Sequence, residues 1–340
     1  MPDGTAVQKY ILSAGAYTLE LTSLGAAIVG ITVPDKTGNP RQVVAGFSSA
    51  EEYLGMSGCY GAVVGRVANR IKGAAFGLDG KTYRLTPNEG ENALHSGEAN
   101  FSYRVWDAEI IDGAAPAVCF SLCSPDGDGG FPGNLRVSAT YSLTDRGDIS
   151  LQMTADTDKP TVVNLTNHAY FNLSGVGSGA VLDHRLMLHA DCITESDTAL
   201  IPTGRIVPVD GTPYDFRDGK TIGEGLRYAD AQLSSLGGFD HNYLLPRADG
   251  IREAAAVSSP ESGISMRLLT NQPCVQFYTV YSERKKLPYA GGEVPTRLDT
   301  FCLEAQAMPD AVHHPDICDI TLRPGERYDK TVIFSFSVRD

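Results

Sequence analysis

The sequence has few basic residues for its length. Its 340 residues contain 28 Lys and Arg against 41 Asp and Glu, which gives a formal net charge of -13 at pH 7. Sequence-independent binding to nucleic acid or to an anionic membrane needs clustered cations. We therefore expect neither nucleic acid nor a membrane as a partner, and a neutral or cationic small molecule fits the composition better.

Long apolar runs and paired cysteines are also missing. No run reaches the ~18 apolar residues of a membrane-spanning helix, and residues 1–15 lack the basic and apolar regions of a secretory signal. The seven cysteines are an odd number, and no two of them are separated by the two residues that are typical of a zinc or redox motif. We predict a cytoplasmic protein with reduced thiols.

The sequence lacks the motifs of several common enzyme classes. It has no GxSxG, no P-loop and no GxGxxG after a strand, which excludes the usual serine nucleophile, phosphate and dinucleotide sites. It has no HExxH, and the adjacent His313 and His314 are poorly placed to bind one metal together. We therefore expect no metal site.

Strand-like runs of period two extend from residue 17 to the C-terminus, with short turn clusters between them. In the last run, Val332, Phe334 and Phe336 share one face with Val338. Helical patterns are few and short, at residues 48–54 and 222–233. The pattern predicts an all-β protein, a large antiparallel β-sandwich or barrel, which we expect to be a single domain over residues 1–340.

The run NLTNHAYFNL, residues 164–173, combines an apolar face with a polar one. As an extended strand, it has the following two faces: Leu165, Asn167, Ala169, Phe171 and Leu173, against Asn164, Thr166, His168, Tyr170 and Asn172. The polar face could be an ordinary solvated sheet face, in which His168 only bonds its neighbours, or it could line a site. Thr166 and Tyr170 are the neighbours that we expect to fix the ring of His168.

Glu304 is a carboxylate inside an apolar strand. In FCLEAQ, residues 301–306, it shares its face with Cys302 and Gln306. A buried carboxylate is costly unless it is paired or hydrogen-bonded. Glu304 is therefore either a glutamate on an exposed sheet face, which propensity alone favours, or a functional group.

Other polar residues are candidates with an ordinary alternative. His95 lies in a loop rich in Gly, Asn and Ser, where it could be a plain turn residue. Arg70, with Asn69 beside it, could hold a hydroxyl-rich or anionic ligand, or it could end an exposed strand. Asp240 precedes His241, and neighbours on a strand point to opposite faces, so only one of the two can face a given pocket.

Taken together, these segments resemble the aldose 1-epimerase (galactose mutarotase) family. TNHAYFNL and the pattern LE.Q..PDA..HP are the most specific of them. The matching stretches are residues 65–71, 85–97, 164–173, 237–245, 270–279, 303–316 and 322–336.

The resemblance implies a galactose mutarotase-like supersandwich that interconverts the α and β anomers of a free aldose without metal or cofactor. It implies that Glu304 is the base at the anomeric hydroxyl and that His168 is the acid at the ring oxygen. The sugar-contacting residues that it implies are Asn69, Arg70, His95, Asp240 and Gln276. We add Tyr170 because it is two residues from His168 and so on the same face. The partner is a monosaccharide, and we expect a monomer or a weak homodimer.

The chemistry also makes sense from the residues alone. Opening a cyclic hemiacetal requires one proton to leave the C1 hydroxyl while another reaches the ring oxygen, and a carboxylate and an imidazole supply both near neutral pH. A glycosidase normally needs two carboxylates. A sugar-binding regulatory protein without catalysis and a β-sandwich hydrolase or lyase acting on oligosaccharides are the competing hypotheses.

The chain departs from the family pattern in three places. Ala305 stands where Thr is more common, and Cys274 stands where Gly is common. Residues 278–300 do not follow the usual continuation after FYT. None of these changes removes a proposed catalytic group, but the last leaves the pocket rim and the preferred sugar undetermined.

Overall fold

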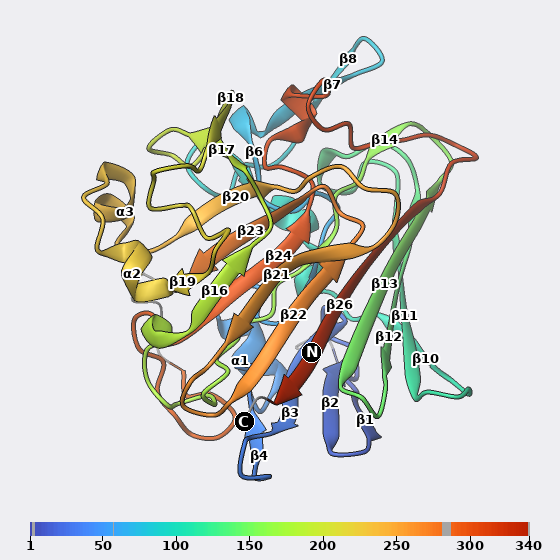
Figure 1. Ribbon diagram of the computed structural model, residues 1–340. Helices are drawn as coiled ribbons and strands as arrows, with labels where there is room; N and C mark the ends of the chain where they lie inside the picture. The colour runs from blue at the N-terminus through green and yellow to red at the C-terminus, as the bar shows by residue number, and fades with distance from the viewer. Residues whose placement is uncertain (2–3, 57, 281–286, 339–340) are drawn as a thin grey trace.

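Two large antiparallel sheets form the body of the protein (Figure 1). The computed structural model describes residue 1 and residues 4–56, 58–280 and 287–338. Within them, the largest sheet has nine strands and the next has five. Every pairing inside these two sheets is antiparallel. The prediction of an antiparallel, mostly β protein is confirmed.

The strands of the two large sheets follow one another in space in an order that differs from their order in the chain. The nine-stranded sheet consists of β10 (Asp107–Ile111), β11 (Ala117–Ser124), β12 (Leu135–Leu143), β13 (Asp148–Thr157), β26 (Tyr328–Val338), β22 (Ile264–Thr270), β21 (Arg252–Ser258), β16 (Arg185–Leu188) and β19 (Lys220–Thr221). The five-stranded sheet consists of β18 (Pro202–Pro208), β17 (Cys192–Ser196), β20 (Asp240–Leu244), β23 (Cys274–Thr279) and β24 (Phe301–Gln306).

Smaller sheets surround these two. A four-stranded sheet near the N-terminus contains β1 (Lys9–Ala14), β2 (Tyr17–Thr22), β3 (Ala27–Pro34) and β4 (Pro40–Gln42). The two-stranded pairs are β5 (Val63–Val64) with β15 (Thr166–Asn167), β6 (Arg70–Ile71) with β9 (Ala93–Leu94), β7 (Ala75–Leu78) with β8 (Lys81–Arg84), and β14 (Thr161–Val162) with β25 (Thr321–Leu322).

The main hydrophobic core lies between the two large sheets. Tyr141 of β12 and Phe334 of β26 belong to the same buried cluster as Phe277 of β23 and Leu303 of β24. Period two produces this layer, since alternate residues of β12 are buried from Leu135 to Leu143. Burying a large apolar side chain stabilises the fold by about 1.5–3 kcal/mol. Of the apolar face predicted for the last strand, Val332, Phe334 and Phe336 are buried, whereas Val338 at the end of the strand is 37% exposed.

The helices are few and short, as predicted. Within the described residues, the α-helices are α1 (Ala50–Gly55), α2 (Ile222–Leu226) and α3 (Ala231–Leu236). Ser49 and Glu52 form a capping box at the start of α1. The predicted helix over residues 222–233 is wrong in its extent, because Asp230 accepts hydrogen bonds from the backbone of Gln232 and Leu233 and starts a second helix. Among the helices that the structure describes, none has the length and hydrophobicity to cross a bilayer.

Arg66, four residues before Arg70, is a structural residue. Its guanidinium is fully buried. It donates hydrogen bonds to the carbonyl oxygens of Pro132 (2.7 Å), Gly133 (3.1 Å) and Ser124 (3.1 Å). Burial lowers the pKa of Arg66 to about 10, so the group stays charged at neutral pH. The side chain therefore ties the loop before β12 to the segment that leads into the site.

Replacing Arg66 with Met is expected to lower the free energy of unfolding by roughly 3 kcal/mol or more, because several buried carbonyls lose their donor. Urea unfolding followed by circular dichroism measures this loss. Arg136→Met is the matched control, since 78% of the Arg136 side chain is exposed, and a change within about 0.5 kcal/mol is expected for it. Equal stability of the two variants would show that Arg66 does not support the fold.

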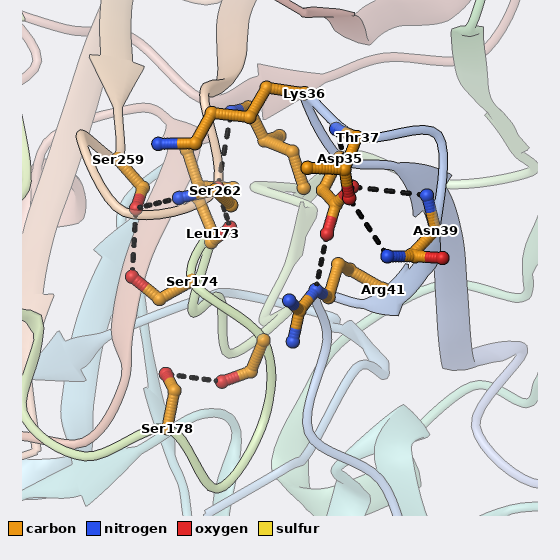
Figure 2. A network of polar contacts seen from close by, with 12 residues as sticks. Asp35, Lys36, Thr37, Asn39, Arg41, Leu173, Ser174, Ser178, Ser259 and Ser262 are labelled. Atoms are coloured by element: carbon orange, nitrogen blue, oxygen red, sulfur yellow. Dashed lines mark hydrogen bonds and ion pairs between the residues drawn. The ribbon is translucent and has the colours of Figure 1, made fainter.

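Asp35 organises the turn between β3 and β4 (Figure 2). Its carboxylate accepts hydrogen bonds from the hydroxyl of Thr37 (2.6 Å), the backbone of Asn39 (3.0 Å) and the Nε of Arg41 (2.8 Å). The hydrogen bonds from Thr37 and Arg41 hold the pKa of Asp35 far below its usual range. The turn also reaches the β21–β22 turn, because Lys36 donates its backbone N–H to Ser262 O at 2.8 Å.

Asp35→Asn is expected to lower the free energy of unfolding at pH 7. A carboxylate whose pKa is lowered by folding stabilises the protein above its unfolded pKa of about 3.9, and this stabilisation is lost as the pH falls below that value. The difference between the variant and the wild-type protein should therefore shrink between pH 7 and pH 3. Urea titrations at both values test this, and a difference that stays constant with pH would contradict it.

Candidate active site

Glu304 lies in β24, in which every residue is buried. The predicted faces are confirmed, because Phe301, Leu303 and Ala305 join the main core while Cys302 belongs to a second cluster on the opposite side. Only 2% of Glu304 is exposed. The alternative of a glutamate on a solvated sheet face is therefore wrong. A carboxylate held at this depth needs charged or hydrogen-bonding neighbours.

The segment NLTNHAYFNL is not a ten-residue strand. Only Thr166–Asn167 forms a strand, β15, so the predicted extent is wrong. The reason is that its backbone bonds to different neighbours in turn: the N–H of His168 donates to Ala62 O at 3.0 Å, and that of Phe171 donates to Phe301 O at 2.7 Å. Its whole length is nevertheless buried. The segment is thus packed between the β5 region and β24.

The segment has the two predicted faces although it does not form a regular strand. Leu165, Ala169 and Phe171 pack in the main core. His168 and Tyr170 lie against the other cluster, in which Tyr170 contacts Tyr278 of β23. The solvated-face alternative is wrong, since His168 is 5% exposed.

His168 and Glu304 face each other. The Nε2 atom of His168 lies 3.6 Å from the Oε2 atom of Glu304, and both side chains are buried. The Tyr170 ring stacks on the imidazole, with centroids 4.9 Å apart and planes 13° apart. The hydroxyl of Thr166 instead donates to Ala305 O at 2.9 Å, so it ties the segment to β24 and does not hold the ring.

Gln276 is the cross-strand neighbour of Glu304, because it stands opposite it in the β23–β24 register. The side chain of Gln276 donates to Asp240 Oδ1 at 2.7 Å. Side chains that share a sheet face in register lie close together. The five-stranded sheet therefore gathers Asp240, Gln276 and Glu304 on one face.

Asp240 and His241 diverge as predicted for neighbours on a strand. Asp240 bonds with Gln276, whereas His241 is buried against Tyr214, with ring centroids 4.4 Å apart. Burial lowers the pKa of His241 to about 4, so this imidazole is neutral near pH 7. Asp240 is thus the member of the pair on the face of Glu304.

Asn69 and His95 meet where β6 pairs with β9. The backbone N–H of Asn69 donates to His95 Nδ1 at 3.1 Å, and that of His95 donates to Asn69 O at 2.9 Å. A ring nitrogen that accepts a hydrogen bond carries no proton, so His95 presents a protonated Nε2 on its other side. The His95 and His168 rings meet edge to face at 5.5 Å and 74°.

Arg70 is buried and paired, which excludes the exposed strand end. Its Nε and Nη2 atoms contact the two carboxylate oxygens of Glu89 at 2.6 and 2.9 Å. Such a two-point contact fixes the plane of the guanidinium. Glu89 keeps 38% of its side chain exposed. The site therefore reaches solvent beside this pair.

Asp310 holds the backbone on both sides of Ile71, the residue after Arg70. Its N–H donates to Arg70 O at 2.9 Å, and its Oδ1 accepts from the N–H of Lys72 at 2.9 Å. The same carboxylate bonds His313 at 2.7 Å, which raises the pKa of His313. The PDA part of the family pattern therefore supports the site and lies outside the group around Glu304. Among the described residues, no cluster of His, Cys, Asp and Glu is arranged to hold a metal ion.

The C-terminal end of the site segment is fastened by serine side chains (Figure 2). The hydroxyl of Ser262 donates to Leu173 O at 2.6 Å, and those of Ser174 and Ser259 lie 2.7 Å apart. These contacts join the segment to the β21–β22 turn, which Lys36 connects to the turn around Asp35. His168 is thus positioned by a segment that is fixed at both ends.

The sequence as a whole matches one family. The family model described as aldose 1-epimerase matches residues 8–335. The chain belongs to the aldose 1-epimerase family. Galactose mutarotase from Rattus norvegicus is 41% identical over 335 residues, covering 98% of this chain and 95% of the relative. Aldose 1-epimerase from Escherichia coli is 36% identical over 339 residues, covering 98% and 96%.

Solved structures of the aldose 1-epimerase family have the same fold. An aldose epimerase homologue from C. elegans superposes with a TM-score of 0.90 at 31% identity, covering 98% of this chain and 100% of that one. Galactose 1-epimerase from Lactobacillus acidophilus superposes with a TM-score of 0.86 at 26% identity, covering 99% and 96%. The predicted galactose mutarotase-like sandwich is therefore confirmed.

Several residues near Glu304, His168 and Arg70 are not singled out as candidates by the sequence pattern. Glu89, the partner of Arg70, lies in the matching loop but carries no pattern of its own. Asn242 stands opposite Gln276, so period two could have found it. Period two does place Gln306 on the face of Glu304, but nothing in the sequence marks it as a candidate. Within the described residues, neither polar side-chain atom of Gln306 has a hydrogen-bond partner. Tyr60, a loop residue whose ring stacks on Tyr170 at 4.0 Å, has no sequence signal.

Proposed function

We propose that the protein interconverts the α and β anomers of a free aldose, with Glu304 as base and His168 as acid. The observation that carries this proposal is the 3.6 Å approach of His168 Nε2 to Glu304 Oε2 in a buried site. The anomeric hydroxyl and the ring oxygen are bonded to the same carbon, so the base and the acid that serve them must be close neighbours. Membership of the aldose 1-epimerase family supports the same reaction.

The reaction balances with these two groups alone. Glu304 takes the proton of the C1 hydroxyl, the C1–O bond becomes a carbonyl, the bond from C1 to the ring oxygen breaks, and His168 protonates that oxygen. After rotation about C1–C2, His168 takes the proton back while the ring closes on the other face of the carbonyl. Glu304 then returns its proton to the new C1 hydroxyl. A positioned acid or base typically contributes ~10² to 10⁴-fold.

We place the sugar between the His168–Glu304 pair and a ring of hydrogen-bonding groups. Asp240 and Gln276 are joined to each other and stand beside Glu304, so they can bind adjacent hydroxyls. His95 offers a protonated Nε2, and Arg70 is oriented by Glu89. Asn69, whose N–H bonds to His95, completes this side. Tyr170 is buried behind the imidazole, which favours support of His168 over contact with the sugar.

Galactose and glucose are the aldoses that we propose first, since the rat relative is named a galactose mutarotase. The seven cysteines are all free thiols. This fits a cytoplasmic location, where thiols stay reduced. We keep the expectation of a monomer or a weak homodimer.

Polarimetry tests the proposed function. Freshly dissolved α-galactose, α-glucose and a panel of pentoses should each be followed with and without the protein. We expect a protein-dependent increase in the rate of anomer equilibration that is proportional to protein concentration. Sugar binding by calorimetry without any such increase would favour the non-catalytic sugar-binding alternative, and release of new reducing ends from oligosaccharides would favour the hydrolase.

A further inference from the structure

A column of aromatic rings stands behind the imidazole of His168. The Tyr170 ring lies on His168 at 4.9 Å and 13°, and the Tyr60 ring lies on Tyr170 at 4.0 Å and 20°. The planes are thus close to parallel through all three rings. Tyr60 comes from the loop after α1, about a hundred residues before Tyr170 in the sequence. The column is therefore a tertiary arrangement that local sequence does not produce.

Two aromatic rings also pack against the edges of the His168 imidazole. His95 meets it edge to face at 5.5 Å, and Tyr278 does so at 6.2 Å. The Nε2 atom is directed to Glu304. Because the flat face rests on Tyr170, the imidazole can turn or slide only if Tyr170 moves. Tyr170 itself is held by its hydroxyl, which donates to Gly58 O at 2.8 Å.

The far end of the column is also buried against other aromatic rings. Tyr60 is 3% exposed, and Phe47 and Tyr289 pack against its ring at 4.9 and 6.5 Å. The hydroxyl of Tyr289 donates to Asp299 Oδ2 at 3.1 Å, and the backbone N–H of Thr296 donates to the same oxygen at 2.8 Å. The column therefore rests on part of the segment that departs from the family pattern.

We propose that Tyr60 is a positioning residue for His168: its ring holds Tyr170 flat against the imidazole and so keeps Nε2 directed at Glu304. This inference rests on the proposed function. In the proposed reaction, Tyr60 touches neither the sugar nor the reacting atoms. Its ring acts through Tyr170, because an aromatic face that fills the space behind Tyr170 leaves that ring no room to tilt. A small misorientation of an acid group costs rate more than it costs binding.

The test compares two variants. Tyr60→Leu removes the flat aromatic ring but keeps an apolar side chain, whereas Tyr60→Phe keeps the aromatic ring. We expect Tyr60→Leu to lower kcat by roughly tenfold or more with KM within about twofold, and Tyr60→Phe to keep at least about half of the wild-type kcat. Phe47→Leu is the matched control, since Phe47 packs edge-on against Tyr60 in the same cluster but does not stack on Tyr170. Its kcat should stay within about twofold.

A double-mutant cycle with His168→Ala separates positioning from general damage. If Tyr60 acts through His168, Tyr60→Leu should change the residual rate by less than about twofold once His168 is absent. An equal loss in both backgrounds, a loss confined to KM, or a Tyr60→Phe variant as slow as Tyr60→Leu would overturn the proposal. A wild-type protein without anomer-equilibrating activity would instead refute the proposed function, so the two failures are distinct.

Discussion

Glu304→Gln is expected to lower kcat for anomer equilibration by about 10²-fold or more, because the amide cannot accept the proton of the C1 hydroxyl. Gln has nearly the shape of Glu, so the packing of β24 should persist. Glu304 is 2% exposed, and its neighbours include His168 at 3.6 Å. Polarimetry at saturating galactose measures the effect. KM is expected to change much less than kcat, since the proton transfer occurs only in the transition state.

The chain offers a matched control for this variant. Glu253 forms a second glutamate–histidine pair, with Oε1 3.2 Å from His189 Nε2, but both side chains are about one third exposed. Glu253→Gln should leave kcat within about twofold. If Glu304→Gln also retained kcat within that range, with an unchanged circular dichroism spectrum, Glu304 would not be the base.

His168→Gln is expected to reduce kcat by a similar factor, about 10²-fold or more, because a carboxamide does not donate a proton to the ring oxygen near neutral pH. Removing both groups should cost little more than removing one, since residues that act as a unit are strongly non-additive. Polarimetry of the two single variants and the double variant measures this. His189→Gln is the control and should keep the wild-type rate within about twofold.

A different pattern would disprove the role of His168. If His168→Gln lost binding but kept kcat, the residue would hold the sugar and would not serve as the acid. If the two single losses multiplied in the double variant, Glu304 and His168 would act in independent steps. Thermal unfolding must accompany each measurement, because His168 is buried and its ring packs against Tyr170.

Much of the fold could be predicted from the alternation of apolar residues. Alternation puts Val332, Phe334, Phe336 and Val338 on one face, and the first three are buried in the core, while Val338 is exposed where the strand ends. Alternation says less about where a strand ends, because the end depends on partners distant in the sequence. Residues 164–173 have the two predicted faces but do not form one continuous strand, because their N–H groups bond to different segments, at Ala62 and at Phe301.

The position of a candidate residue could be predicted where the residue lies on a strand face. It could not be predicted where contacts between distant segments determine it. Glu304 and Gln276 lie on strand faces, and the structure brings them together as cross-strand neighbours. The pairing of Arg70 with Glu89 and the stacking of Tyr60 on Tyr170 join segments without a shared periodicity. The rim could not be predicted either, and residues 281–286 of the divergent segment lie outside the described residues.

Exchange NMR of galactose at anomeric equilibrium in D₂O tests the central claim most directly. The proposed mechanism predicts cross-peaks between the α and β anomeric protons that grow with protein concentration, with the C1 proton retained, since ring opening breaks no C1–H bond. The same spectra with folded Glu304→Gln should show exchange at close to the uncatalysed rate. Absence of protein-dependent exchange with the folded wild-type protein, or equal exchange with the variant, would contradict the mechanism.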